Sequence, residues 1–145
     1  MRNEPVILVA EDDENDVLLL RRALKTAKVF AGLSVVRNGQ EAIDYLSGHG
    51  NYVDRAAHPW PAVMLLDLKM PMVDGFDVLT WWRDQRGERE LPIVVLSSSG
   101  LESDTERALS LGAAAYRVKP TDFQDLVTVA EEVRERWLKP NSAVP

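Results

Sequence analysis

Short apolar runs alternate with helical patterns along the chain, and this alternation restricts the fold more than any other feature. Runs with the length of a strand and few polar residues occupy positions 6–10, 33–36, 62–66, 93–96 and 115–118. Each run is followed by a segment in which apolar residues recur at helical spacing. Strands that are covered by helices on both faces belong to parallel sheets. The alternation therefore predicts an α/β fold, an open, doubly wound, five-stranded parallel sheet with right-handed crossovers.

Several details of the predicted helices can be compared with a structure. Thr121, with Gln124 three residues later, is predicted to cap the last helix, and Pro140 to end it. The apolar stripe of that helix is Phe123, Leu126, Val127, Ala130, Val133 and Trp137. In the helix that begins near position 75, Trp82 follows the core stripe, whereas Trp81 lies off it and is predicted to be exposed.

Length and composition indicate one domain and exclude several kinds of function. A chain of 145 residues suits a single domain over 1–145, with a core of about 5–138 and a short C-terminal tail. The net charge of −6 disfavours direct binding to nucleic acid, and the lack of cysteine excludes thiolate nucleophiles and zinc–thiolate sites. No signal peptide or membrane-spanning run is visible, so we expect a cytoplasmic protein without membrane contact.

Acidic residues stand where two of the predicted strands end. Glu11, Asp12 and Asp13 follow the first strand, and Asp67 follows the third. In the common strand order 2-1-3-4-5 these two strands are neighbours, and ligands bind at the switch point between them. Carboxylates that lie close together repel unless a cation joins them. An open acidic edge suits Mg²⁺ better than a caged calcium site, so the sequence predicts a magnesium site here.

These acidic residues also have simpler interpretations. Glu11, Asp12 and Asp13 could cap the first helix, where the helix dipole favours acids. Asp67 could be a cap or a turn residue. Because Asp67 closes an entirely apolar strand, it could instead act beside a metal as a nucleophile towards phosphorus, which would give an aspartyl phosphate.

The fourth and fifth strands end in residues that suit phosphate chemistry. Ser97 ends the fourth strand and could hydrogen-bond a phosphoryl oxygen, although serine clusters usually form turns. Lys119 ends the fifth and could pair with a carboxylate or a phosphoryl group, although most lysines extend into solvent. Taken together, the interpretations as caps, turns and solvent-exposed lysine are less convincing, because the acids, the hydroxyl and the lysine all fall at strand ends.

The four strand-end segments together resemble the receiver domain of response regulators in two-component signalling. They are VAEDDEND, LLDLKMPMVDG, VVLSSSG and GAAAYRVKP, and the resemblance extends over residues 6–138. It implies a flavodoxin-like receiver fold in which Asp67 is the phosphoacceptor. It also implies that Glu11, Asp12, Asp67 and the backbone carbonyl of Lys69 bind Mg²⁺, with Asp13 as a lesser candidate.

The same resemblance assigns residues that respond to phosphorylation. It makes Ser97 the switch hydroxyl, Lys119 the phosphoryl-binding lysine and Tyr116 the aromatic switch; a half-buried edge-strand aromatic is the alternative for Tyr116. The side chain of Lys69 departs from the family pattern, which often has a small or amide residue there. Its ammonium could pair with the phosphoryl group or hinder an attacking water, so the lifetime of the phosphate is left open.

Further segments resemble the single-domain, phytochrome-associated regulators. They are YLSGHGNYVDRAAHPWP, which holds the loop residues His49 and His58, and VLTWWRDQ. The implied partner is a sensor histidine kinase, of phytochrome type, or a phosphotransfer protein. Output would pass through a partner protein, a homodimer or onward phosphotransfer. The protein would then not be an enzyme beyond its own phosphorylation and dephosphorylation. A docking module that works without phosphate, and a Mg²⁺-dependent phosphohydrolase, are the alternatives.

Overall fold

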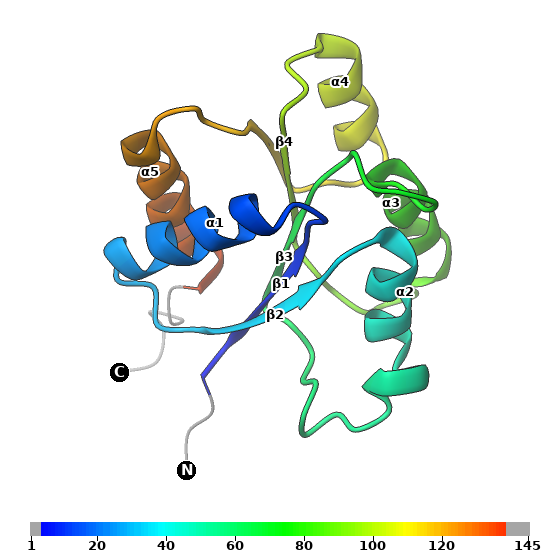
Figure 1. The fold of residues 1–145 in the computed structure, drawn as a ribbon. Coiled ribbons are helices and arrows are strands. Elements are labelled where there is room, and N and C mark those ends of the chain that lie inside the picture. Colours follow the sequence, from blue (N-terminus) through cyan, green and yellow to red (C-terminus); the bar gives the residue numbers. More distant parts are fainter. Residues whose placement is uncertain (1–3, 139–145) are drawn as a thin grey trace.

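A parallel sheet of five strands forms the centre of the protein. The computed structural model describes residues 4–138, and the strand order is β2-β1-β3-β4-β5 with every neighbouring pair parallel (Figure 1). The strands are β1 Val6–Ala10, β2 Gly32–Val36, β3 Val63–Leu66, β4 Ile93–Ser97 and β5 Ala115–Val118. The predicted fold class and strand order are confirmed, and the predicted strands agree within one residue at each end.

Helices cover both faces of this sheet. They are α1 Glu14–Thr26, α2 Gly39–Ser47, α3 Gly75–Gln85, α4 Glu102–Ser110 and α5 Phe123–Val133, with a short 3₁₀ turn at Gly50–Tyr52 and a π-helical turn at Arg134–Leu138. In Figure 1, α1 and α5 lie together on one face, and α2 and α3 lie on the other with α4 above them. Among residues 4–138, no helix has both the length and the apolar character to cross a membrane.

Strand residues alternate between two apolar cores. Leu8, Met64 and Ile93 pack in the core under α2 and α3, whereas their neighbours Ile7 and Val63 pack in the core under α1 and α5. Successive side chains of a strand point to opposite faces, so a strand buried on both faces needs an unbroken apolar run. The apolar runs in the sequence are therefore explained by the layered fold.

Three details of the predicted helices are wrong. The cap of α5 is Asp122, not Thr121: its backbone is extended, and its carboxylate accepts a hydrogen bond from the Gln124 amide at 2.8 Å. Phe123 is 39% exposed, because side chains tilt towards the N-terminus and that of a first helical residue extends past the helix end. Trp81 is half-buried against the core, whereas Trp82 is buried as predicted. Pro140 lies outside the described residues.

Candidate functional site

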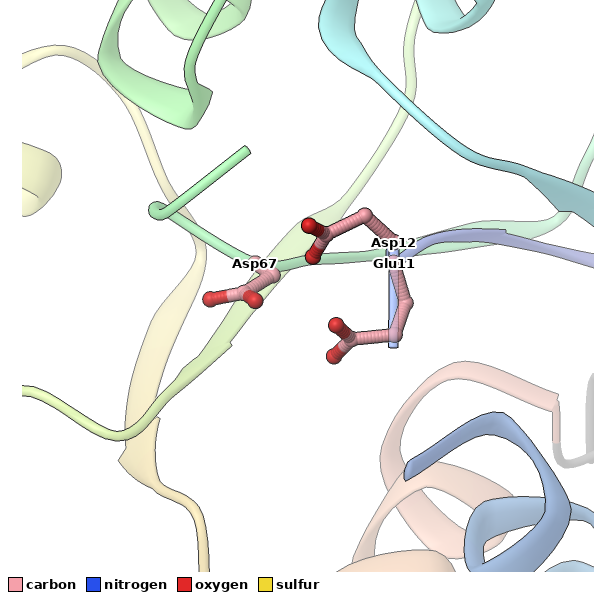
Figure 2. Close-up of side chains that lie close together, drawn as sticks. All are labelled: Glu11, Asp12 and Asp67. Carbon is pink, nitrogen blue, oxygen red and sulfur yellow. The ribbon is translucent and has the colours of Figure 1, made fainter. Parts of the chain in front are cut away.

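Three carboxylates meet at the edge where β1 and β3 end. The two strands pair in register, and the Asp67 amide donates to the Ala10 carbonyl at 3.1 Å, which places Asp67 beside Glu11 and Asp12. Carboxylate oxygens of the three residues all lie within 4.8 Å of one another, and Figure 2 shows the three side chains converging. Glu11 and Asp67 are buried and Asp12 is exposed. Carboxylate oxygens open to water on one side are the ligands that Mg²⁺ prefers, so this donor set fits such an ion.

The backbone after Asp67 is held by the first turn of α3. The Gly75 amide donates to the Leu68 carbonyl at 2.9 Å. A Cβ atom on Gly75 would lie 2.6 Å from the Asp67 carbonyl oxygen, so only glycine allows this close approach. The Lys69 amide donates to Asp67 Oδ1 at 3.2 Å, while the Lys69 side chain is exposed. The hydrogen bond from the Lys69 amide and the close contact with Gly75 thus fix the orientation of Asp67.

Lys119 brings a positive charge to these acids. Its amide donates to the Ser97 carbonyl at 2.7 Å, which places it at the end of β5. Its ammonium nitrogen, Nζ, lies 2.6 Å from Glu11 Oε1, 2.7 Å from Asp16 Oδ2 and 3.3 Å from Asp67 Oδ2. The side chain is 18% exposed, so the ammonium is held among carboxylates and away from most of the solvent.

Asp16 was not among the residues predicted for this site. It lies in the first turn of α1, and the helix returns it towards the end of β1, where Glu11 stands. The acid-rich segment EDDEND contains it, and its place in the first helical turn is the signal that could have identified it. A residue six positions after a strand end, such as Asp16 after Ala10, can thus reach the same site when a helix begins in between.

Burial and charge alter the proton affinity of this cluster. Burial raises the pKa of Glu11 to about 7; the hydrogen bond from Lys119 opposes this rise, and the nearby Asp67 charge adds to it. Burial alone would lower the pKa of the Lys119 ammonium, but hydrogen bonds to Asp16 and Glu11 raise it above its ordinary value. The excess of acids over cations is a further reason why the site suits a divalent ion.

Asp13 has the capping role that was the alternative for all three acids after β1. Its Oδ1 accepts hydrogen bonds from the Asn15 amide at 2.8 Å and the Asp16 amide at 3.2 Å, as an N-cap does. It does not belong to the carboxylate cluster found among the described residues. Glu11 instead accepts from the Asp13 amide at 3.1 Å and faces Lys119.

Ser97 is the last residue of β4, and Tyr116 lies within the neighbouring strand β5. Ser97 is fully buried, and its hydroxyl oxygen accepts a hydrogen bond from the Ser99 amide at 3.3 Å. Tyr116 points inward, is 8% exposed and donates to the Ser99 carbonyl at 2.8 Å. The Ser99 hydroxyl donates to Asp104 Oδ2 at 2.6 Å, which ties the loop to α4. Tyr116 is therefore buried, although β5 is an edge strand, and Ser99 and Asp104 are partners that the sequence analysis did not identify.

The two histidines lie outside this constellation. His58 lies edge-on to the rings of Tyr45 and Tyr52, at centroid distances of 5.8 and 5.0 Å, in the loop before β3. His49 is exposed and precedes the 3₁₀ turn. Neither belongs to the carboxylate cluster of the described residues, in agreement with their prediction as loop residues.

Known proteins share both the sequence and the fold. Residues 7–131 match the response regulator receiver domain. The response regulator RPA3017 in red light signaling of R. palustris is 36% identical, with a TM-score of 0.88 over 95% of this chain and 96% of that one. The phosphorylated cyanobacterial phytochrome response regulator RcpA is 30% identical, with a TM-score of 0.85 over 97% of this chain and 98% of that one.

A further relative has a structure that contains a metal. Response regulator Rcp1 of Synechocystis is 31% identical over 92% of this chain and 89% of its own length. The Mn²⁺-bound form of Rcp1 has a TM-score of 0.81 over 95% of this chain and 97% of that one. The family match and these relatives agree with the strand order and the acidic edge described above, and the chain belongs to the response regulator receiver family of two-component signalling.

Proposed function

We propose that this chain is a stand-alone response regulator that accepts a phosphoryl group on Asp67 from the phosphohistidine of a sensor histidine kinase. The observation that carries the proposal is the position of Asp67, a buried carboxylate at the end of β3 that lies beside Glu11 and Asp12 and 3.3 Å from Lys119. The relatives named for phytochrome or red light signalling support a kinase of phytochrome type, or a phosphotransfer protein, as the donor.

Asp67 would act as the nucleophile. One of its oxygens forms a bond to phosphorus while the bond from phosphorus to the histidine nitrogen breaks, and the imidazole keeps the electron pair. The amide of Lys69 fixes one Asp67 oxygen, Oδ1, and Lys119 faces the other, Oδ2. Because the carboxylate cannot rotate freely, it is presented in one orientation.

The acidic edge would hold Mg²⁺. Glu11, Asp12, Asp67 and the backbone carbonyl of Lys69 are the proposed ligands, and the bound ion would neutralise charge that develops on the phosphoryl oxygens. Asp13 is a weaker candidate ligand, since its carboxylate caps α1. Glu11 would need to lose its proton to serve as a ligand, and its pKa of about 7 makes that step accessible near neutral pH.

The phosphoryl group would then change the surface near α4. We expect Lys119 to donate to it and Ser97 to shift its hydroxyl towards it, which would break the bond from the Ser99 amide. Tyr116 and Ser99 connect that loop to β5, so their bond would respond to the same movement. Output through a partner protein, a homodimer or onward phosphotransfer would follow from a shift between two surface states.

The proposal is tested by phosphorylation with acetyl phosphate and Mg²⁺, and with a cognate kinase. We expect wild type to gain one acid-labile phosphoryl group per chain and Asp67→Asn to gain none. Asp84→Asn, the same change at an exposed acid on α3, should behave as wild type. Removal of the metal with a chelator should also prevent phosphorylation.

Other outcomes would favour the two alternatives. If wild type gained no phosphoryl group from either donor, the chain would be a docking module that works without phosphate. Turnover of a generic phosphate ester that Asp67→Asn abolished would instead indicate a phosphohydrolase. Thermal unfolding of Asp67→Asn would show that a loss of phosphorylation is not a loss of fold.

A further inference from the structure

The Lys119 ammonium is surrounded by three carboxylates. An ammonium has three donors, and Glu11, Asp16 and Asp67 each supply one oxygen within 3.3 Å of Nζ. The bonds to Glu11 and Asp16, at 2.6 and 2.7 Å, have the length of strong charge-assisted hydrogen bonds, and the contact with Asp67 is longer. Two short bonds thus hold the ammonium, and the third, weaker contact is directed at the acceptor residue.

The three acids differ in what else they can bind. Glu11 and Asp67 belong to the carboxylate cluster, so a divalent ion there would compete with Lys119 for their oxygens. Asp16 does not belong to that cluster, and it reaches Lys119 from α1, whose inner face is packed in the core. Asp16 is therefore the partner that can keep Lys119 in place when the other two carboxylates have a second cation to bind.

We propose that Asp16 is a positioning residue that holds the Lys119 ammonium beside Asp67, so that Lys119 is already placed to bind a phosphoryl group there. The inference rests on the proposed function of Asp67. It requires no contact between Asp16 and the phosphoryl group. The third N–H of Lys119 exchanges one acceptor, Asp67 Oδ2, for a phosphoryl oxygen, while the bond to Asp16 persists.

If Asp16 had a competing role, its removal would change the strength of phosphoryl binding in the opposite direction. If Asp16 competed with the phosphoryl group for Lys119, removing its charge would strengthen phosphoryl binding. The geometry favours the positioning role, because the longest of the three contacts is the one to Asp67, and that contact is the one that must exchange. Preorganised donors cost no reorganisation when the new acceptor arrives.

The first experiment measures the affinity for beryllofluoride, which stands in for a phosphoryl group on Asp67, by calorimetry at saturating Mg²⁺. We expect Asp16→Asn to weaken binding about ten-fold, a typical effect of removing a partner that orients a binding group, and Asp16→Glu to restore most of the affinity. Glu14→Gln is the matched control: it removes an exposed acid from the same turn of α1, where Glu14 pairs with Arg37. It should leave the affinity within two-fold of wild type, roughly the limit of a screened surface charge.

The second experiment needs neither metal nor phosphoryl mimic. In ¹⁵N-labelled protein, the Lys119 ammonium protons should be visible by NMR in wild type, because the short hydrogen bond to Asp16 and the short ion pair with Glu11 slow their exchange with water. Lys119→Arg assigns the signal by removing it. We expect the signal to disappear in Asp16→Asn and to remain in Asp16→Glu and Glu14→Gln. Urea unfolding of each variant would confirm that the fold is intact.

Other results of these two experiments would contradict either the positioning role of Asp16 or the proposed function. Unchanged or tighter beryllofluoride binding in Asp16→Asn, or an equal loss in Glu14→Gln, would overturn the positioning role. So would a Lys119 signal that persists in Asp16→Asn. If wild type itself failed to bind beryllofluoride, the proposed function would fail, and the NMR result would still show whether Asp16 holds Lys119.

Discussion

The helices that follow β1 and β4 are held in the protein very differently. Both follow a strand that ends in site residues. The α1 helix buries Val17, Leu20, Ala23 and Leu24 and packs along α5, whereas α4 buries Ala108 alone among its residues. In and next to α4, Leu101 is 63% exposed and Leu109 is 46% exposed. The α1 side of the site is therefore held by a large apolar contact, whereas the α4 side is held by few buried residues.

The ends of the two helices differ in the same way. Asp13 caps α1 with its carboxylate, whereas Leu101 at the start of α4 has no side-chain cap. Polar bonds hold the α4 side instead, from Tyr116 to Ser99 and from Ser99 to Asp104. Elements with few buried contacts open at low free energy, and switching elements come from that part of a protein. The firmly packed α1 side therefore suits the fixed placement of Lys119 and the carboxylates, and the weakly packed α4 side suits a change of conformation.

The largest expected effect on stability is that of a leucine-to-alanine substitution in α1, and the same substitution in α4 is its comparison. Leu24 of α1 is 6% exposed and Leu109 of α4 is 46% exposed. We expect Leu24→Ala to lower the free energy of unfolding by about 3 kcal/mol, since it leaves a cavity. Leu109→Ala should change it by no more than about 0.5 kcal/mol, as surface substitutions do. Urea unfolding of the two variants measures both values, and equal losses would refute the comparison.

The fold could be predicted from the sequence because burial on both faces leaves a simple pattern. Unbroken apolar runs predicted the strands, and their alternation with helices predicted a parallel sheet. The strand ends gave Asp67, Glu11, Asp12 and Lys119, which the structure brings together. Each of these residues lies one or two positions after a strand, so the position of the strand decides the position of the side chain.

Residues in the first turn of the helix that follows a strand could not be assigned in this way. Asp16 contacts Lys119 only because the phase of α1 turns it towards the site, and a shift of one residue in the helix start would turn it away. The weak attachment of α4 was not visible either, because the apolar spacing of Leu101, Ala108 and Leu109 resembles a buried stripe. How much of a stripe is covered depends on tertiary packing, which the sequence pattern does not contain.

The second prediction weakens the polar bonds that hold the α4 side. Tyr116→Phe removes the hydroxyl that donates to the Ser99 carbonyl. We expect a loss of about 1 kcal/mol in the free energy of unfolding, the usual value for one buried hydrogen bond. Amide hydrogen exchange should accelerate in residues 98–110 and stay unchanged in α1. Tyr52→Phe, in the 3₁₀ turn before β3, is the control that should leave exchange in 98–110 as it is. Faster exchange in α1 as well would mean that the two sides are not independent.

The smallest expected effect concerns an ion pair on the α5 side. Arg117 of β5 donates from Nε and Nη2 to the two carboxylate oxygens of Glu132 in α5, at 2.8 and 2.7 Å. This pair holds the pKa of Glu132 below its ordinary value of 4.5. A lowered pKa in the folded state means that the stabilisation is present above pH 4.5 and is lost as the pH falls through the folded pKa.

We expect Glu132→Gln to lower the free energy of unfolding by about 0.5 kcal/mol at pH 7, because partly exposed pairs contribute little. The difference from wild type should shrink when unfolding is measured at successively lower pH. Glu131→Gln, the same change at the exposed neighbour on α5, should have no comparable pH dependence. A loss at pH 7 as large as that of Leu24→Ala would show that α5 is held by charge. In that case the firmly packed side of the site would depend on an ion pair and not on its apolar contacts.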